Sequence, residues 1–367
     1  MEKNNLENKI KIIFDYLYNE TNKNCFTIEQ IILGQISLDD IKLPLPNDDE
    51  EQEYYNKNKL DILNAKLSLI DFDENTYQVL FKRYSIESVN IKVNFYDIDN
   101  KIDSFNSPVN NDSLFSYLLS SLVINHKTKH ILLPIINLDI KFSDIEENII
   151  NNTYKTKIKS GITNNKISNI CCLQLREHFF KTINLQEYIK ENTCSYKMVL
   201  FQVIHTLAVI EREFNNFRHN NLILKNILVY IKNKSDQYTE YEFNEKKYFI
   251  MNVDIDIKIT NFENACIPKF YGKEKAGNDI LTFVTDLKTT DKNNNCSKET
   301  LAFIKSIKEN TNVIDLLNNE YFNEYLKNPK ETKIKQEEIG NINVYMDSDN
   351  FSELGNQNLL SRIHNKG

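Results

Sequence analysis

Side chains that could take part in chemistry concentrate in two short segments, each beside an apolar run that predicts a strand. The first segment holds Asn221 and Asn226, and the second holds Asn261. A carboxamide can orient a hydroxyl group, but it has no useful basicity near neutral pH. Mg²⁺ prefers anionic oxygen, usually from one or two carboxylates together with phosphates. These residue types therefore predict groups that position a ligand without supplying charge or accepting a proton.

The order of these segments along the chain is distinctive. His219-Asn-Asn-Leu-Ile-Leu-Lys-Asn226 follows a long apolar helix, Asn261-Phe-Glu263 follows a later strand, and Asp279 opens a helix. This succession resembles the protein-kinase fold, in particular the divergent serine/threonine kinases of large nucleocytoplasmic DNA viruses of the poxvirus and mimivirus type. The first segment is similar to the catalytic loop H-R-D-L-x-x-x-N and the second to D-F-G. The resemblance covers roughly residues 60–325 and is closest across 195–290.

The resemblance implies that the catalytic positions are degenerate. Asn221 stands where the family's aspartate orients the substrate hydroxyl and accepts its proton, and losing a general base typically costs ~10²–10⁴-fold in rate. Asn261 replaces the Mg²⁺-binding aspartate, and the second metal position, Asn226, is neutral too. Ile223 replaces the lysine that usually follows the catalytic aspartate. We therefore expect ATP and Mg²⁺ to bind weakly or not at all.

The positions that hold the fold match the family better. His219 and Phe262 match its two packing residues, which stack across the lobe interface, and Asp279 matches the buried aspartate that ties down the catalytic loop. A chain that keeps the structural positions and lacks the chemical ones resembles a pseudokinase.

The N-terminal half shows the same pattern of losses. By resemblance, the strand lysine that pairs with phosphates is Lys92 or Lys82, and its helix partner, normally a glutamate, falls near Asp112. A solvated strand lysine is an equal alternative for Lys92, and a helix-capping role is an equal alternative for Asp112. The loop over the phosphates is expected at 71–76, which contains no glycine and three carboxylates that would repel phosphates.

Composition excludes several classes of site. The chain has 367 residues but only seven glycines, and no GxGxxG occurs; the nearest approach, Gly272–Gly277, is followed by Asn-Asp instead of Lys and Ser or Thr. Basic residues number 45 against 52 acidic ones, and only five of the basic residues are arginine. Because arginine is the preferred reader of phosphate and guanine, we expect no nucleic-acid partner.

Cysteine and histidine spacing gives no strong metal motif. The six cysteines form no CxxC and lie at no zinc-finger spacing from histidine, so buried thiols are expected. We interpret His126 and His130 as part of a loop. Cys171 and Cys172 are expected on opposite faces of a strand, and Asp254 and Asp256 at a solvated strand edge.

Apolar periodicity predicts the elements that must position these side chains. Helices are expected over 6–19, 112–124, 183–191, 195–214, 278–288, 298–308 and 313–327. Strands are expected over 67–70, 77–81, 89–95, 131–136, 167–175, 227–231 and 255–260, with a polar insert between the last two. The pattern predicts an α+β, two-lobed kinase-like fold with a small β-rich N-terminal lobe and a mainly helical C-terminal lobe.

The lobes are assigned to 59–175 and 176–327. Residues 1–58 are predicted to form a helical and polar extension that ends in an acidic exposed loop at 47–58, and 328–367 a polar tail.

Three functions follow from these expectations. The first is a catalytically impaired pseudokinase that acts by binding a protein partner, such as an active kinase or a host or viral factor. The second is a residually active ATP-dependent serine/threonine kinase, and the third a structural or interaction protein without a kinase fold. The sequence has no apolar N-terminal leader and no run of 18 apolar residues. We therefore expect no membrane segment and a cytoplasmic protein, in the host cytoplasm if the chain is viral.

Overall fold

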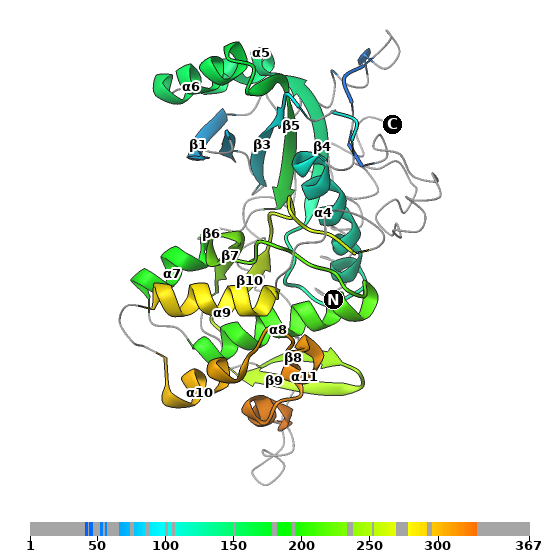
Figure 1. Ribbon diagram of the computed structural model, residues 1–367, viewed down its shortest axis with the longest axis vertical. Coiled ribbons are helices and arrows are strands. Elements are labelled where there is room, and N and C mark those ends of the chain that lie inside the picture. The colour runs from blue at the N-terminus through cyan, green and yellow to red at the C-terminus, as the bar shows by residue number, and fades with distance from the viewer. Residues whose placement is uncertain are drawn as a thin grey trace, which may run out of the picture. The chain divides into compact units, whose positions relative to one another are not determined.

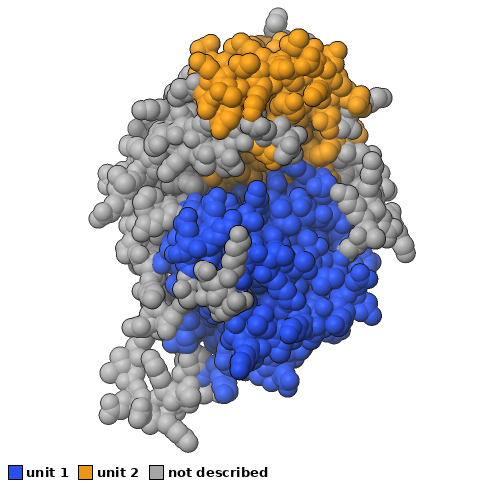
Figure 2. Space-filling view, turned by 60° about the vertical axis from the view of Figure 1, so that its left-hand side comes forward, with its two compact units in different colours: residues 1–11, 119–132, 180–348 blue, residues 12–118, 133–179, 349–367 orange. Residues whose placement is uncertain are grey.

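The chain forms two compact units in the computed structural model (Figures 1 and 2). The sheet unit contains the described residues of 12–118 and 133–179, and the helical unit those of 119–132 and 180–348. The structure describes residues 41–42, 44–46, 52–53, 56, 66–73, 77–84, 89–99, 102–104, 107–149, 151–177, 182–192, 195–232, 238–251, 253–268, 278–291 and 296–328. The helix predicted at 6–19 and the tail at 328–367, apart from Asn328, lie outside these residues.

The sheet unit is built on five antiparallel strands in the order β1-β2-β3-β5-β4. These strands are β1 (Lys66–Asp73), β2 (Gln78–Tyr84), β3 (Val89–Asp97), β4 (Pro134–Lys141) and β5 (Ile167–Glu177). Helix α4 (Pro108–Ile124) follows β3 and continues into the helical unit. The connection from β4 to β5 carries α5 (Phe142–Ile145), the 3₁₀ helix η3 (Glu146–Asn148) and α6 (Asn152–Thr163), which lie at one end of the sheet in Figure 1.

One face of this sheet is apolar and holds the unit's core. Strand β3 contributes Ile91, Val93 and Phe95, whose side chains pack with apolar residues of β4, β5 and α6. Alternation along a strand places these three residues on one face. Full burial of one such side chain stabilises the fold by about 1.5–3 kcal/mol, so this face supplies most of the unit's driving force for folding.

The opposite face of β3 is polar, buried and covered by α4. Asn94 Nδ2 donates to Gln174 Oε1 of β5 at 3.1 Å, and Gln174 Nε2 donates to Ser113 Oγ of α4 at 2.9 Å. Buried polar groups must be hydrogen-bonded to avoid a large desolvation cost. The two amides and the hydroxyl therefore fix how α4 lies on the sheet.

A buried ion pair extends this polar face. Lys42 Nζ lies 2.8 Å from Asp139 Oδ2 of β4, and the Tyr96 hydroxyl lies 2.6 Å from Asp139 Oδ1 and 3.1 Å from Asn110 Oδ1 of α4. Burial raises the pKa of Asp139, and Lys42 and Tyr96 offset only part of that shift. Lys42 belongs to the stretch predicted as an extension, yet it is part of the interior of the sheet unit.

The helical unit is organised around α8 (Tyr196–Glu213), which is buried from Met198 to Ile210. The unit also contains α7 (Leu185–Glu191), α9 (Asp279–Thr290), α10 (Lys298–Ser306), α11 (Val313–Leu317) and the 3₁₀ helix η5 (Glu320–Leu326). A three-stranded sheet of order β10-β7-β6 consists of β6 (Thr182–Asn184), β7 (Ile227–Ile231) and β10 (Ile255–Ile259). A separate hairpin pairs β8 (Tyr238–Phe243) with β9 (Lys246–Met251).

The predicted polar insert is wrong for residues 238–251, which form the β8–β9 hairpin. Asn244 and Glu245 at its turn both have positive φ, 47° and 64°, as a two-residue turn between twisted strands requires. Tyr241 and Tyr248 point inward and pack against the ring of Phe201 on α8 at 5.2 Å and 5.1 Å. Polar residues alternate with these aromatic ones, so the segment is polar on average although the hairpin is amphipathic.

Most of the other predicted elements that fall on described residues are present with shifted ends, and the α+β class is confirmed. The helix predicted at 112–124 begins earlier, at Pro108, and the strand predicted at 131–136 is β4, which runs from Pro134. The helix predicted at 313–327 is two elements, because the Asn319 side chain accepts from the Tyr321 amide and caps a new 3₁₀ helix that begins at Glu320. Helix α6 was not predicted. The predicted lobe bounds stay predictions.

Two buried histidines predict that acid destabilises the helical unit. Burial lowers the pKa of His205 to about 4 from an ordinary value near 6.5. An unfolded chain therefore binds a proton between pH 6.5 and 4 that the folded chain does not, and stability falls as pH falls through this window. The loss is about 1.4 kcal/mol per pH unit and about 3 kcal/mol in total. Burial lowers the pKa of His130 as well, which adds to the loss.

Urea unfolding between pH 7 and 5 measures this slope. His205 Nε2 lies 3.2 Å from the Glu242 carbonyl, and the amide of a glutamine at this position can still donate to that carbonyl. His205→Gln is therefore expected to reduce the dependence of stability on pH by the amount that one bound proton contributes. An unchanged slope in His205→Gln would contradict the assignment of a neutral buried imidazole.

Candidate functional site

The segment similar to a catalytic loop leaves α8 and returns through the 3₁₀ helix η4 (Leu224–Asn226) to β7. Leu222 and Leu224 are fully buried, so the loop is anchored by apolar side chains on the inside. Asn220 has a φ of 60°, in the left-handed region that asparagine tolerates better than most residues. Its Nδ2 donates to the Asn264 carbonyl at 2.8 Å, which fastens the loop to the segment after Asn261.

Asp279, at the start of α9, holds the backbone of this loop. Its Oδ2 accepts from the His219 amide at 2.7 Å and its Oδ1 from the Asn220 amide at 2.9 Å. Hydrogen bonds to a charged acceptor contribute about 1.5–3 kcal/mol each. Further along α9, Asp286 Oδ2 accepts from the Leu224 amide at 2.7 Å. This role of Asp286 was not predicted. The position of an acidic residue two helical turns after Asp279 is the sequence feature that could have indicated it.

His219 and Phe262 lie against each other, as the resemblance implies. Their ring centroids are 5.1 Å apart and both side chains are buried. His219 Nε2 lies 3.0 Å from the carbonyl oxygen of Thr260, the residue before Asn261. Since a carbonyl only accepts, Nε2 carries the proton in this contact.

The three asparagines meet in one hydrogen-bonded chain. Asn261 Nδ2 donates to Asn226 Oδ1 at 3.0 Å, and Asn226 Nδ2 donates to the Asn221 backbone carbonyl at 2.8 Å. The carbonyl of Asn221 can only accept, so it fixes the orientation of the Asn226 amide and turns Oδ1 toward Asn261. Asn261 must then present its NH₂ group. Its φ of 72° is a left-handed conformation.

This arrangement engages the side-chain oxygen of Asn226 in a hydrogen bond. The resemblance implies that residues at positions 226 and 261 direct oxygens at Mg²⁺, whereas in the structure the Asn261 amide donates to the Asn226 amide. A carboxylate at position 261 could not make this bond, because it has no hydrogen to donate. Among the described residues, no group of three or more histidines, cysteines or acids is placed to hold a metal. The side chains at positions 221, 226 and 261 are themselves neutral amides.

In the sheet unit, Lys92 pairs with Asp112. Lys92 Nζ lies 3.0 Å from Asp112 Oδ2, and both side chains are at most 5% exposed. A solvated position for Lys92 is therefore wrong. The capping alternative for Asp112 is also wrong, because α4 begins at Pro108 and Asp112 lies in its second turn, facing β3. The other candidate, Lys82, lies on β2, paired with Ser68 of β1 and Asn90 of β3.

The predicted phosphate-covering loop is shorter than expected. Strand β1 continues through Asp73, so Asp71 and Asp73 are paired with Leu80 and Gln78 of β2. Residues 74–76 lie outside the described residues. Two of the three carboxylates assigned to the loop thus belong to a strand.

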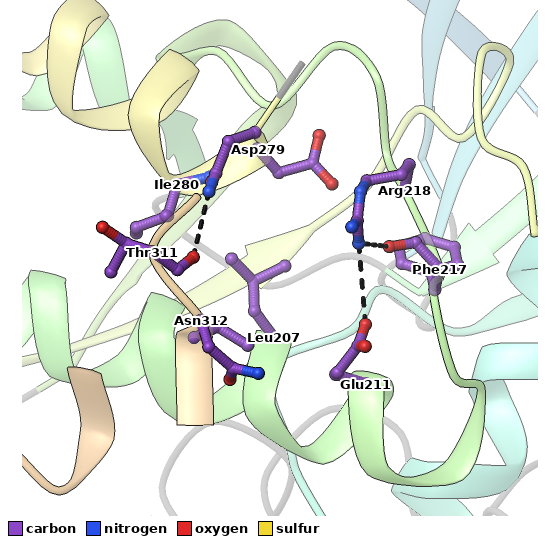
Figure 3. Close-up of a pocket in the computed structure, with 10 residues that line it drawn as sticks. Leu207, Glu211, Phe217, Arg218, Asp279, Ile280, Thr311 and Asn312 are labelled. Carbon is purple, nitrogen blue, oxygen red and sulfur yellow. Dashed lines mark hydrogen bonds and ion pairs between the residues drawn. The ribbon is translucent and has the colours of Figure 1, made fainter. Parts of the chain in front are cut away.

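A small pocket of about 90 Å³ opens beside Asp279 in the helical unit (Figure 3). Arg218 lies on its wall, with Nη1 2.7 Å from the Phe217 carbonyl and 3.6 Å from Glu211 Oε2. The lining is completed by Leu207, Asn278, Ile280, Thr311, Asn312 and Val313. None of the three asparagines of the candidate site lines this pocket.

The histidine pair is a loop, as predicted. His126 is exposed, whereas His130 is buried, with Nδ1 2.9 Å from the Ile257 carbonyl and Nε2 3.1 Å from the Tyr241 hydroxyl. Neither ring nitrogen of His130 is available to a shared metal.

The cysteine pair is as predicted, and the aspartate pair is not. Cys171 belongs to the apolar core of the sheet unit, and Cys172 faces the other way, beside Tyr96. Asp256 is buried and bound to lysines, so a solvated edge is wrong for it. Partners distant in sequence neutralise its charge.

The chain is similar to viral proteins, two of which are named putative serine/threonine kinases. A scan against protein-family models found no match. Three relatives come from Acanthamoeba polyphaga mimivirus. "Putative serine/threonine-protein kinase R400" is 30% identical over 251 residues, 61% of this chain and 53% of the relative. "Putative serine/threonine-protein kinase R301" is 34% identical over 71 residues, 19% of this chain and 18% of the relative. "Uncharacterized protein R402" is 26% identical over 188 residues, 50% of this chain and 22% of the relative.

The chain spans about half the length of one of these relatives and less of the other two. Together with the α+β architecture, this similarity to mimivirus proteins named putative serine/threonine kinases agrees with the predicted resemblance to divergent viral kinases. Among the described residues, no helix is both long and apolar enough to cross a membrane.

Proposed function

We propose that this chain is a catalytically impaired kinase-like protein that acts by binding another protein, such as an active kinase or a host or viral factor. The observation that carries the proposal is the hydrogen bond from Asn261 Nδ2 to Asn226 Oδ1. It engages an oxygen that the kinase resemblance assigns to Mg²⁺. Phosphoryl transfer depends on metal ions that neutralise charge developing on the phosphates.

Asn221 also supports the proposed loss of catalytic activity. At the position of the catalytic base, Asn221 offers a carboxamide that cannot accept a proton from a substrate hydroxyl near neutral pH. Meanwhile Asp279 still holds the loop backbone through two hydrogen bonds. A loop with a supported backbone and neutral side chains is suited to presenting a surface to a partner.

A phosphotransfer assay tests the proposal. Purified chain with ATP and Mg²⁺ or Mn²⁺ is expected to transfer no phosphate to itself or to a generic serine/threonine substrate. Transfer that disappears in Asn221→Ala would overturn the proposal, because activity would then depend on the degenerate site.

Asn261→Asp tests the hydrogen bond itself. The substitution removes the donor and sets a carboxylate against Asn226 Oδ1, so we expect the free energy of unfolding without divalent ions to fall by about 1–3 kcal/mol. Mg²⁺ is expected to recover stability in the variant by binding between the two oxygens, and to leave the unsubstituted chain unchanged. Thermal unfolding with EDTA and with Mg²⁺ measures both effects.

Asn165→Asp is the matched control, since Asn165 is exposed in a turn of the sheet unit. It should change stability little and show no response to Mg²⁺. A melting temperature that rises with Mg²⁺ in the unsubstituted chain would contradict the hydrogen-bonded amide pair.

Residual kinase activity is the second candidate, and the buried Lys92–Asp112 pair favours it. The resemblance assigns this pair to phosphate binding, and two relatives carry the name of serine/threonine kinases. This candidate predicts that ATP with Mg²⁺ raises the melting temperature and that Lys92→Met removes the rise. A melting temperature that stays constant when ATP and Mg²⁺ are titrated would count against residual kinase activity.

A further inference from the structure

The described residues of 41–46 reach both faces of the sheet unit beside β4, the last strand in the order β1-β2-β3-β5-β4. Lys42 Nζ lies 2.8 Å from Asp139 Oδ2 on the polar face, whereas Leu45 packs against the apolar core on the other face. Leu138 of β4 belongs to that core, and alternation along the strand directs its neighbour Asp139 the opposite way. We call this segment the strap.

Lys42 of the strap engages all three hydrogens of its ammonium group. Its Nζ donates to the Tyr96 hydroxyl at 2.6 Å, to Asp139 Oδ2 at 2.8 Å and to the Ile102 carbonyl at 3.5 Å. The centroid of the Tyr96 ring lies 4.8 Å from the same nitrogen, within reach of a cation–π interaction. The Lys42 side chain is 2% exposed, so water does not replace these contacts.

The same groups hold the start of α4. The Tyr96 hydroxyl lies 3.1 Å from Asn110 Oδ1 in the first turn of this helix. Asn110 Nδ2 donates to the Ser104 carbonyl at 2.8 Å and also to the Ile102 carbonyl, which accepts from Lys42. Asn110 is fully buried, so the loss of a partner costs it a large desolvation penalty. One hydroxyl and one carbonyl therefore connect the strap to α4.

Helix α4 in turn carries Asp112 to Lys92. Asp112 follows Asn110 by two residues, and its Oδ2 lies 3.0 Å from Lys92 Nζ. Both side chains of this pair are at most 5% exposed. Because an α-helix is held by hydrogen bonds between successive turns, a displacement of Asn110 also displaces Asp112.

We propose that the strap positions α4 and thereby controls how firmly Asp112 holds Lys92. A protein partner that drew the strap off the sheet would release α4 and open the pair. The inference bears on the candidate of residual activity, for which this pair is the supporting observation. Its test uses no nucleotide, so the strap can fail the test while that candidate stands, and the reverse.

The rate at which acetic anhydride labels Lys92 in the full chain, measured by mass spectrometry, reports the state of the pair. Lys92 should react slowly in the unsubstituted chain, because its amine is buried and paired. Lys42→Met keeps the length of the side chain but removes its charge and all three hydrogens. We expect labelling of Lys92 to become at least about tenfold faster in this variant, through local opening of α4. Labelling as slow as in the unsubstituted chain would overturn the proposal.

Tyr96→Phe is the second variant, and it keeps the test decisive if Lys42→Met fails to fold. The substitution retains the buried ring and the ion pair of Lys42, and removes the hydroxyl that Asn110 contacts. Labelling of Lys92 should again become faster, but by less, because the Ile102 carbonyl still joins Lys42 to Asn110. A variant in which Lys92 reacts no faster would refute the control of the pair by the strap.

Hydrogen exchange distinguishes release of α4 from unfolding of the whole unit. The amides of 109–114, at the start of α4, should exchange faster in both variants. Those of β5, at the centre of the same sheet, should keep their rates. Equal acceleration in α4 and β5 would overturn the proposal, because the strap would then only stabilise the unit as a whole.

Lys159→Met is the matched control for the loss of a lysine from the sheet unit. Lys159 also pairs with a carboxylate, that of Glu146, but it is 54% exposed and belongs to α6. This variant should leave the labelling rate of Lys92 unchanged. A rate that rises as much as in Lys42→Met would show that the effect does not depend on the strap.

Discussion

Replacing Asp279 by alanine is expected to lower the free energy of unfolding by about 3–6 kcal/mol. The carboxylate accepts the backbone amides of His219 and Asn220, and each bond to a charged acceptor contributes about 1.5–3 kcal/mol. Alanine offers no acceptor, so the His219 amide, which belongs to a fully buried residue, loses its partner. Urea unfolding followed by circular dichroism measures the loss.

Two other aspartates of the helical unit serve as comparisons for Asp279→Ala. Asp286 accepts a single amide, that of Leu224, and Asp286→Ala should cost about half as much. Asp315 is exposed on α11, and Asp315→Ala should stay within about 0.5 kcal/mol. Equal losses in Asp279→Ala and Asp315→Ala would show that Asp279 does not hold the loop.

Hydrogen exchange locates the effect in the chain. The amides of His219 and Asn220 should exchange faster in Asp279→Ala than in Asp286→Ala, while the amides of the β8–β9 hairpin should keep their relative protection. A chain that loses only global stability would show uniform acceleration. An ordered loop favours the proposed function, because a pre-ordered surface loses less conformational entropy when a partner binds.

Asp139→Ala is expected to cost about 3–5 kcal/mol, the usual result of removing one member of a buried ion pair. The substitution leaves the ammonium group of Lys42 and the hydroxyl of Tyr96 inside the sheet unit without their shared acceptor. Asn110 of α4 contacts the same hydroxyl, so the position of α4 should loosen too. Denaturant unfolding measures the stability, and exchange of the α4 amides measures the loosening.

An exposed ion pair of the same unit is the matched control. Lys159 is 54% exposed where it meets Glu146, and Lys159→Met should change stability by less than about 1 kcal/mol. The double variant Lys42→Met with Asp139→Leu should recover much of the loss, because burial raises the pKa of Asp139 and the intact pair itself is costly to desolvate. A double variant as unstable as Asp139→Ala would refute this explanation.

How much the sequence predicts differs between the two units. In the helical unit, the resemblance implied the contact between His219 and Phe262, and the two rings do lie together. The contact between Asn226 and Asn261 follows from the structure, where strands β7 and β10 pair and bring their ends together. In the sheet unit, Lys92 and Asp112 were only candidates, since alternation along a strand cannot tell a solvated face from one covered by a helix.

Residue types and order determined the resemblance to the protein-kinase fold, and they determined that Asn221, Asn226 and Asn261 carry no charge. That information is local: an asparagine is neutral wherever the chain places it. Only the tertiary structure decided which amide group donates between Asn226 and Asn261, that Lys42 reaches Asp139, and that Lys129 and Lys232 pair with Asp256. These contacts join residues far apart in sequence, and their strength depends on burial, which packing sets and composition does not.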